Sequence, residues 1–149
     1  MSANYIRTIS PSTQEVLFER QGTTFDEVVH IAKTSHNAFQ SYKKFSLAER
    51  KSIINKALDL IDEQKETLAA ELTAQMGRPI AFAAKEITTM RKRANYLVSI
   101  ADKSLEPILG TPEDGFRRFV KKEPLGVAFI AFAWNVGLHY LPLLLIKLY

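Results

Sequence analysis

The sequence predicts a mostly helical protein of the α/β class, and three observations support this. Apolar residues recur at helical spacing through most of residues 23–105, which predicts four amphipathic helices. Two short strand-like runs around a proline turn precede them. Beyond Gly115 the pattern becomes that of strands, and residues 127–133 lack the polar alternation of a half-exposed strand. We therefore expect a helical layer with an N-terminal hairpin, a basic strand and the first strand and helix of a parallel sheet.

The composition is that of one folded domain. Of the 149 residues, 46% are apolar and 24% are charged, close to globular averages. The absence of cysteine excludes disulfides, thiolate metal sites and a cysteine nucleophile within these residues. The net charge of +4 comes from scattered basic pairs diluted by acids, so we expect no nucleic-acid partner. No signal-peptide pattern is visible, and we expect a cytoplasmic location, with a mitochondrial one left open.

The start of the helical region carries two capping boxes. Residues 5–9 and 16–19 are the strand-like runs of the predicted hairpin, and the first helix follows it. Its start pairs a hydroxyl with a carboxylate three residues later, Thr24 with Glu27, and Ser46 with Glu49 repeats the arrangement. These spacings predict helices that begin just after Thr24 and Ser46.

The later helices have clear end signals. Gly77 suits the position after a helix, where a positive φ is free of a Cβ clash, and Pro79 blocks continuation. The fourth helix keeps its apolar register through residues 83–105, until Pro107 stops it. Residues 108–115 are predicted as a loop, and residues 116–122 as a strand whose basic residues guard a sheet edge.

Asn135 is the one residue that the pattern singles out for chemistry. The three histidines have no metal-ligand spacing, so we expect no metal site. Asn135 follows an apolar strand, and a buried amide without a partner costs about 1–3 kcal/mol. Spacing alone favours a helix N-cap at this position. The functional alternative is an amide that donates to a developing oxyanion.

Several separated motifs resemble the N-terminal part of the aldehyde dehydrogenase superfamily. The sequence EPLGV at residues 123–127, followed by Trp134-Asn135, resembles the entry to the coenzyme domain of that family. Upstream, LAER at residues 47–50 and LTAQMGRP at residues 72–79 match it in the same order. The resemblance covers about residues 5–135. The blocks at residues 43–50 and 75–79 look most like the succinate-semialdehyde dehydrogenase branch.

The resemblance implies roles for two residues. In this family, which oxidises small-molecule aldehydes to carboxylic acids, the asparagine at the Asn135 position donates to the thiohemiacetal oxyanion. Trp134 and Asn135 would border the nicotinamide of NAD or NADP. The cysteine nucleophile and general-base glutamate of the family have no counterpart among these residues. We therefore expect a truncated aldehyde dehydrogenase-like protein that is inactive alone and binds no coenzyme by itself.

The resemblance also divides the chain into four parts. Residues 1–22 form the hairpin and residues 23–115 the four-helix region. Residues 116–126 are a basic strand similar to the segment that aldehyde dehydrogenases use in subunit assembly, which implies a homo- or hetero-oligomer through residues 116–123. Residues 127–149 begin an incomplete NAD(P)-binding sheet. We expect the resemblance to stop after Asn135, where a retained intron, a shifted reading frame or a divergent helix would explain the tail.

Two other function classes stay open. Residues 125–146 have no formal charge and the length of a membrane-spanning helix, which would make this a membrane-associated protein. Two glycines and a proline within the run oppose that hypothesis. The other alternative is an interaction partner that docks on full-length relatives.

Overall fold

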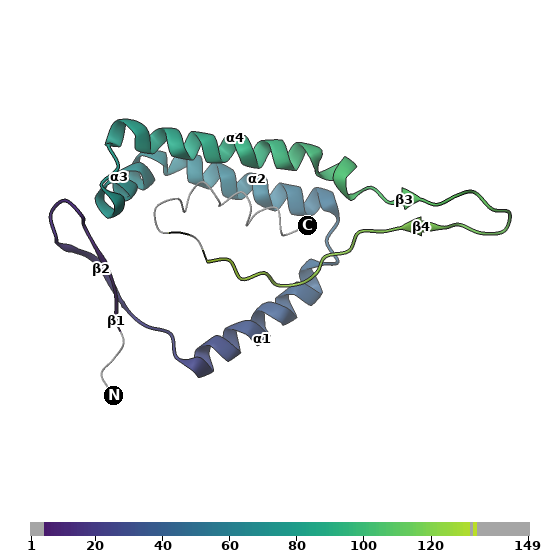
Figure 1. Cartoon of the computed structure of the whole chain (residues 1–149), viewed down its shortest axis with the longest axis horizontal. Helices are drawn as coiled ribbons and strands as arrows, with labels where there is room; N and C mark the ends of the chain where they lie inside the picture. Colours follow the sequence, from purple (N-terminus) through teal and green to yellow (C-terminus); the bar gives the residue numbers. More distant parts are fainter. Residues whose placement is uncertain (1–4, 132, 134–149) are drawn as a thin grey trace.

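The elements follow the predicted order in a computed structural model that describes residues 5–131 and 133. A hairpin comes first, in which β1 (Tyr5–Ile9) pairs antiparallel with β2 (Val16–Gln21). Four helices follow: α1 (Phe25–Tyr42), α2 (Leu47–Glu63), α3 (Lys65–Met76) and α4 (Ile80–Leu105). A second antiparallel pair, β3 (Ile108–Leu109) with β4 (Phe119–Val120), forms a ribbon that projects from the helices (Figure 1).

Both predicted capping boxes are confirmed. The Thr24 hydroxyl accepts a hydrogen bond from the Glu27 backbone N–H at 3.3 Å, and the Glu27 carboxylate accepts one from the Thr24 N–H at 2.7 Å. Ser46 and Glu49 form the same pair at 3.2 and 2.7 Å. These bonds hold the pKa of both carboxyls below its ordinary value, chiefly through the Thr24 backbone and the Ser46 side chain. Helices α1 and α2 therefore begin directly after Thr24 and Ser46, as the sequence predicts.

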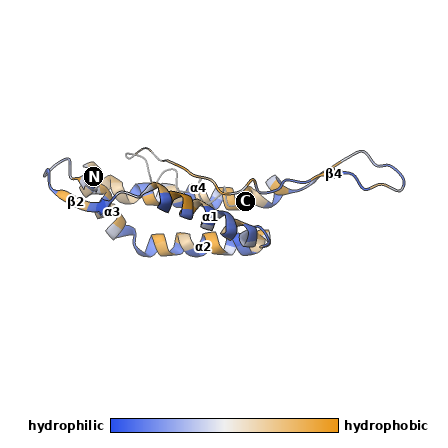
Figure 2. Cartoon of the chain, turned by 90° about the horizontal axis from the view of Figure 1, so that it is seen from below, coloured by the Kyte–Doolittle hydropathy of each residue, from blue (hydrophilic) through white to orange (hydrophobic). Residues whose placement is uncertain are grey.

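The hydrophobic core lies between α2, α3 and α4. These helices bring together one cluster of buried side chains: Ile54, Leu58, Ala69, Ala83, Ile87, Met90 and Ala94. Three of the seven are alanines, whose small side chains let helix backbones approach closely. In Figure 1, α4 and α2 run side by side with α3 at one end, and Figure 2 shows apolar and polar residues alternating along α2. The amphipathic stripes predicted from the sequence thus face one another.

Helix α1 lies apart from this core. None of its 18 residues is buried, and Phe25, Val28 and Ile31 are exposed on it, Phe25 to 80%. Figure 1 places α1 at an angle to α2 and α4. The described residues therefore leave the apolar stripe of α1 uncovered.

Ion pairs join α2 to α4 across the edge of the core. The Arg91 guanidinium of α4 contacts Asp59 at 2.8 Å and Asp62 at 3.0 Å on α2. At the other end of the same pair of helices, Lys51 contacts Asp102. Partly exposed pairs of this kind are worth only about 0–1 kcal/mol each. Their main effect is to fix the register of α4 along α2.

The strand predictions after α4 need correction. Residues 108–115, predicted as a loop, contain β3, and the strand predicted over residues 116–122 is paired only at β4. Residues 127–131 form no ladder, and Val127 and Phe129 are exposed rather than buried. A strand with both faces covered needs neighbouring strands. Over residues 5–131 and 133 no strand lies beside this segment, so Val127 and Phe129 are not covered by a neighbouring strand.

We expect Leu58→Ala to lower the free energy of unfolding by about 2–5 kcal/mol, because it opens a cavity in the α2–α4 core. Leu60→Ala is the matched control in the same helix, since Leu60 is 57% exposed and should change stability little. Urea denaturation followed by circular dichroism measures both variants. Equal losses would contradict the assignment of the core to this face of α2.

Candidate functional site

The predicted site residues Trp134 and Asn135 lie outside the residues that the structure describes. Their roles in coenzyme contact and oxyanion stabilisation therefore stay predictions. The chain that leads to them is described through Ala131 and at Ala133. The structure describes this approach and the other motifs that carry the family resemblance.

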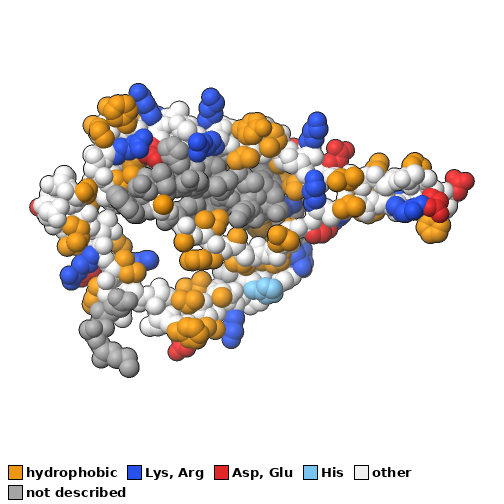
Figure 3. Space-filling view, in the orientation of Figure 1, with side chains coloured by type: hydrophobic (Ala, Val, Ile, Leu, Met, Phe, Trp, Pro, Cys, Tyr) orange, Lys and Arg blue, Asp and Glu red, His pale blue; other side chains and the backbone are white. Residues whose placement is uncertain are grey.

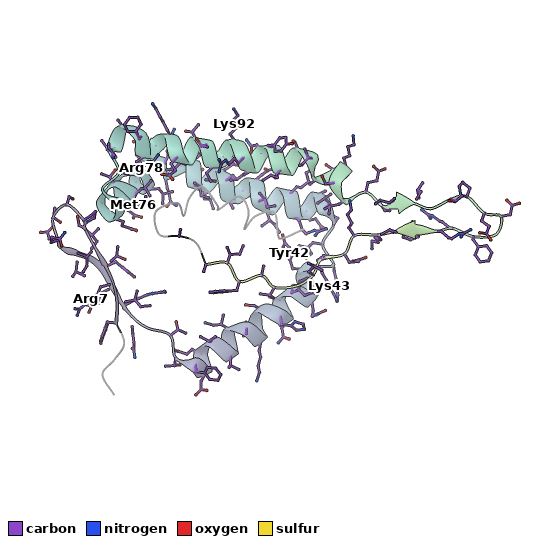
Figure 4. The ribbon with its side chains drawn as sticks, in the orientation of Figure 1. Arg7, Tyr42, Lys43, Met76, Arg78 and Lys92 are labelled. Atoms are coloured by element: carbon purple, nitrogen blue, oxygen red, sulfur yellow. The ribbon has the colours of Figure 1, made fainter. Side chains whose placement is uncertain are left out.

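The approach begins at Glu123, where the ribbon returns to the helices. The Glu123 carboxylate accepts a hydrogen bond from the Lys121 ammonium at 2.6 Å. This bond and the charge of Lys121 hold the pKa of Glu123 below its ordinary value, and the charge of Lys43 at the end of α1 adds to the effect. Figure 4 shows Lys43 beside the chain that leaves the ribbon. The start of the EPLGV motif thus carries an exposed ion pair with Lys121 and lies in the field of the Lys43 charge.

A side-chain hydrogen bond and a glycine then direct the chain away from the ribbon. The Lys122 ammonium donates a hydrogen bond at 2.5 Å to the carbonyl of Ser104, in the last turn of α4, where the helix dipole favours a cation. Gly126 has a φ of 128°, a conformation that residues with a Cβ rarely adopt. A Cβ added at Gly126 would meet no atom within 4 Å, so the glycine serves backbone direction and not close packing.

Beyond Gly126 the chain is exposed. Phe129 is 93% exposed and Val127 more than half exposed, whereas their pattern is that of buried residues. Since residues 127–131 have no strand partner, the described residues fix the direction in which the chain leaves the helical region but do not form a sheet edge.

The structure brings one motif of the family resemblance, LTAQMGRP, into contact with the hairpin turn. Gly77, at the end of α3, has a φ of 71° and donates its N–H to the Thr73 carbonyl at 2.8 Å, as predicted for a helix C-terminus. A Cβ added there would lie 3.2 Å from the Pro11 side chain in the hairpin turn. Ser10, beside that turn, is buried. Figure 1 shows the hairpin next to α3. The absence of a side chain at Gly77 therefore permits the positive φ and also leaves room for the Pro11 side chain.

Sequence reasoning missed a buried ion pair next to this contact. The Arg78 guanidinium, between α3 and α4, lies 3.3 Å from the carboxylate of Glu86, whose side chain is almost fully buried in α4. Figure 4 shows Arg78 and Met76 together at this end of the helices. A signal was available, because Glu86 falls among Ala83, Ile87 and Met90 on the apolar stripe. An acidic residue in that position needs a partner.

The described residues do not themselves form a site for a metal or a dinucleotide. Within residues 5–131 and 133, no three His, Cys, Asp or Glu side chains converge on a metal-sized position. The same residues contain no glycine-rich turn joining a strand to a helix, the arrangement that holds a pyrophosphate. None of the helices described has both the length and the apolar content needed to cross a bilayer. Most of residues 125–146 lie outside the described residues.

The hairpin, helices and ribbon together have the architecture of a known class of proteins. The model of the aldehyde dehydrogenase family matches residues 1–145. The chain therefore belongs to the aldehyde dehydrogenase family. The match continues to residue 145, so our expectation that the resemblance stops after Asn135 is wrong.

The curated relatives include succinate-semialdehyde dehydrogenases. The NADP(+) enzyme 1 of Mycobacterium tuberculosis is 30% identical over 135 residues, which is 89% of this chain and 30% of that enzyme. The mitochondrial enzyme of Rattus norvegicus is 33% identical over 103 residues, 69% of this chain and 20% of that enzyme. The chain thus spans less than a third of the length of the curated relatives that it matches.

Solved aldehyde dehydrogenases share the fold. Betaine aldehyde dehydrogenase from Staphylococcus aureus superposes with a TM-score of 0.84 at 23% identity, over 93% of this chain and 28% of that enzyme. A 3,6-anhydro-L-galactose dehydrogenase in complex with NAP gives 0.83 at 21% identity, over 93% and 29%. The predicted fold class, an aldehyde dehydrogenase-like N-terminal fragment, is confirmed.

We expect Arg78→Met to destabilise the protein, because it leaves the Glu86 carboxylate buried without this cation. Removing one partner of a fully buried pair costs about 3–5 kcal/mol. Arg78 is 36% exposed, so solvent screening should reduce the loss to about 1–3 kcal/mol. Arg78→Lys keeps the charge and should lose less. Urea denaturation distinguishes them, and equal losses would show that the charge of Arg78 is unimportant.

Proposed function

We propose that this chain supplies the N-terminal scaffold of an NAD(P)+-dependent oxidation of aldehydes to carboxylic acids. Membership of the family and the order of the motifs support the reaction class. Residues 5–126 would hold the approach to Trp134 and Asn135 through Lys122, Glu123 and Gly126. Asn135 would donate its amide N–H groups to the oxyanion that forms as a thiolate attacks the aldehyde.

The 149 residues alone should not oxidise an aldehyde. The reaction class needs a thiol that forms a covalent thiohemiacetal, and these residues include no cysteine. NAD(P)+ would accept the electrons when bound. Because the described residues do not fit a dinucleotide, we assign coenzyme contact only to Trp134 and Asn135, by resemblance, and derive no step through it.

Succinate semialdehyde is the substrate that we propose for the complete enzyme. Sequence similarity to one branch of the family supports this choice. The motif blocks at residues 43–50 and 75–79 are similar to that branch, and the relative from Mycobacterium tuberculosis carries that name. The second block lies at the contact between α3 and the hairpin, where Gly77 faces the Pro11 side chain.

A chimaera tests the role of Asn135. Residues 1–135 of this chain would replace the matching part of the Mycobacterium tuberculosis enzyme, and we expect the product to oxidise succinate semialdehyde with NADP+. Asn135→Ala in this chimaera should lower kcat about 100- to 1,000-fold, the usual effect of losing one oxyanion donor. Asn95→Ala, on exposed α4 surface, is the control. An inactive chimaera, or an unchanged kcat in Asn135→Ala, would overturn the proposal.

We also propose that the ribbon joins two copies of the chain. Both edges of the β3–β4 pair are open among the described residues, and Ile108, Leu109, Phe119 and Val120 are exposed on it. Open strand edges with apolar side chains favour strand addition. Arg117 lies over the Phe119 ring at 5.6 Å, so charge and apolar surface alternate on the ribbon.

Sedimentation velocity would test this assembly. The wild-type chain should self-associate, and Phe119→Asp should shift it toward the monomer, because a carboxylate would be buried in the interface. Phe82→Asp is a matched control, since Phe82 is 52% exposed on α4 and Phe119 48% exposed on β4. A monomeric wild-type protein, or equal effects of the two variants, would contradict a ribbon interface.

A further inference from the structure

A hollow of about 810 Å³ lies where α2 begins, α4 ends and the chain returns from the ribbon. This volume falls within the usual range of ligand pockets, about 300–1,000 Å³. Apolar side chains from all three segments line it, namely Leu47, Leu105, Pro107 and Pro124. A ligand here would therefore contact a hydrocarbon surface whose residues are not part of the buried core cluster.

Charged side chains surround this apolar surface. Four are basic (Arg50, Lys103, Lys121 and Lys122) and three are acidic (Asp102, Glu106 and Glu123). Figure 3 shows basic, acidic and hydrophobic side chains close together where the ribbon leaves the helices. The net charge of the hollow also depends on ion pairs, because two of the acids have lysine partners.

Asp102 and Glu123 are paired with ammonium groups. The hydrogen bond from Lys51, which lies outside the lining, lowers the pKa of Asp102 below its ordinary value. The hydrogen bond from Lys121 does the same for Glu123, and Lys43 adds its charge. Both acids are therefore ionised and neutralised near pH 7. Counting Lys51, five cations stand against three carboxylates, and among the described residues Glu106 is the acid of the lining that has no salt bridge with a lysine.

Two lysines remain to meet an anion. Lys122 donates to the Ser104 carbonyl, which leaves its other ammonium hydrogens available, and Lys103 lies in the last turn of α4. Over residues 5–131 and 133, neither lysine contacts a carboxylate. One comes from the helix and the other from the returning chain, so an anion between them would join the two segments. An ammonium has three N–H donors, of which Lys122 has two left beside its bond to the Ser104 carbonyl.

We propose that this hollow binds an anionic amphiphile, a small molecule with a carboxylate or phosphate head and a short hydrocarbon chain. The head would lie between Lys103 and Lys122, and the chain would cover Leu47, Leu105 and Pro124. Charge complementarity selects the anion, and the apolar lining selects the chain. This proposal does not rest on the proposed oxidation of aldehydes.

Isothermal titration calorimetry of the full 149-residue chain tests the ligand class. Octanoate and octyl phosphate should both bind, and the tighter of the two identifies the preferred head. Octanol has the chain without the charge, and propionate has the charge with little chain, so each should bind at least about tenfold more weakly. Octanol binding as tightly as octanoate would overturn the proposal, as would the absence of binding by both anions.

Substitutions locate the site. Lys103→Gln and Lys122→Gln should each weaken octanoate about tenfold, the effect of one charge-assisted hydrogen bond. Lys33→Gln, on exposed α1, should leave the affinity unchanged. All three lysines are exposed, and circular dichroism would verify that the variants fold. Amide shifts in the NMR spectrum should cluster at Leu105 and Lys122. Equal losses in all three variants, or shifts centred on α1, would place binding elsewhere.

Discussion

The burial of Leu58 of α2 against Ile87 and Met90 of α4 is the interaction on which the rest of the described structure depends. It sets two helices side by side and leaves their ends at fixed positions. The hairpin contacts one end through Pro11 and Gly77, and the ribbon returns to the other through Lys122 and Ser104. Burial of apolar area is the dominant stabilising term. The polar contacts at both ends therefore contribute mainly by orienting the hairpin and the ribbon relative to the helices.

The two ends of this helical pair use polar groups differently. At the hairpin end, the Glu86 carboxylate is buried beside Arg78, so its charge must be balanced inside the protein. At the ribbon end, Lys51, Asp102, Lys121 and Glu123 are paired in contact with solvent. Solvent weakens those pairs, and their arrangement leaves a surplus of positive charge beside an apolar hollow. One end is thus suited to fixing the scaffold and the other to meeting a charged ligand.

Much of the fold could be predicted because it is encoded locally. The starts of α1 and α2, the end of α3 at Gly77 and the hairpin all depend on residues within a few positions of one another. The segment at residues 127–131 could not be predicted this way, since its apolar pattern requires partner strands that the described residues do not include. The candidate site residues, Trp134 and Asn135, were predicted from a family resemblance. The structure determines contacts only for the approach to them, as far as Gly126.

The sequence by itself determined the family, the helices and their amphipathic faces, because capping signals and apolar spacing act over short distances. Only the tertiary structure decided which distant residues meet: Pro11 with Gly77, Arg78 with Glu86, and Lys122 with the carbonyl of Ser104. It also decided that α1 is left exposed while α2, α3 and α4 share a core. A periodic pattern states that a face needs covering, but the packing of whole helices determines what covers it.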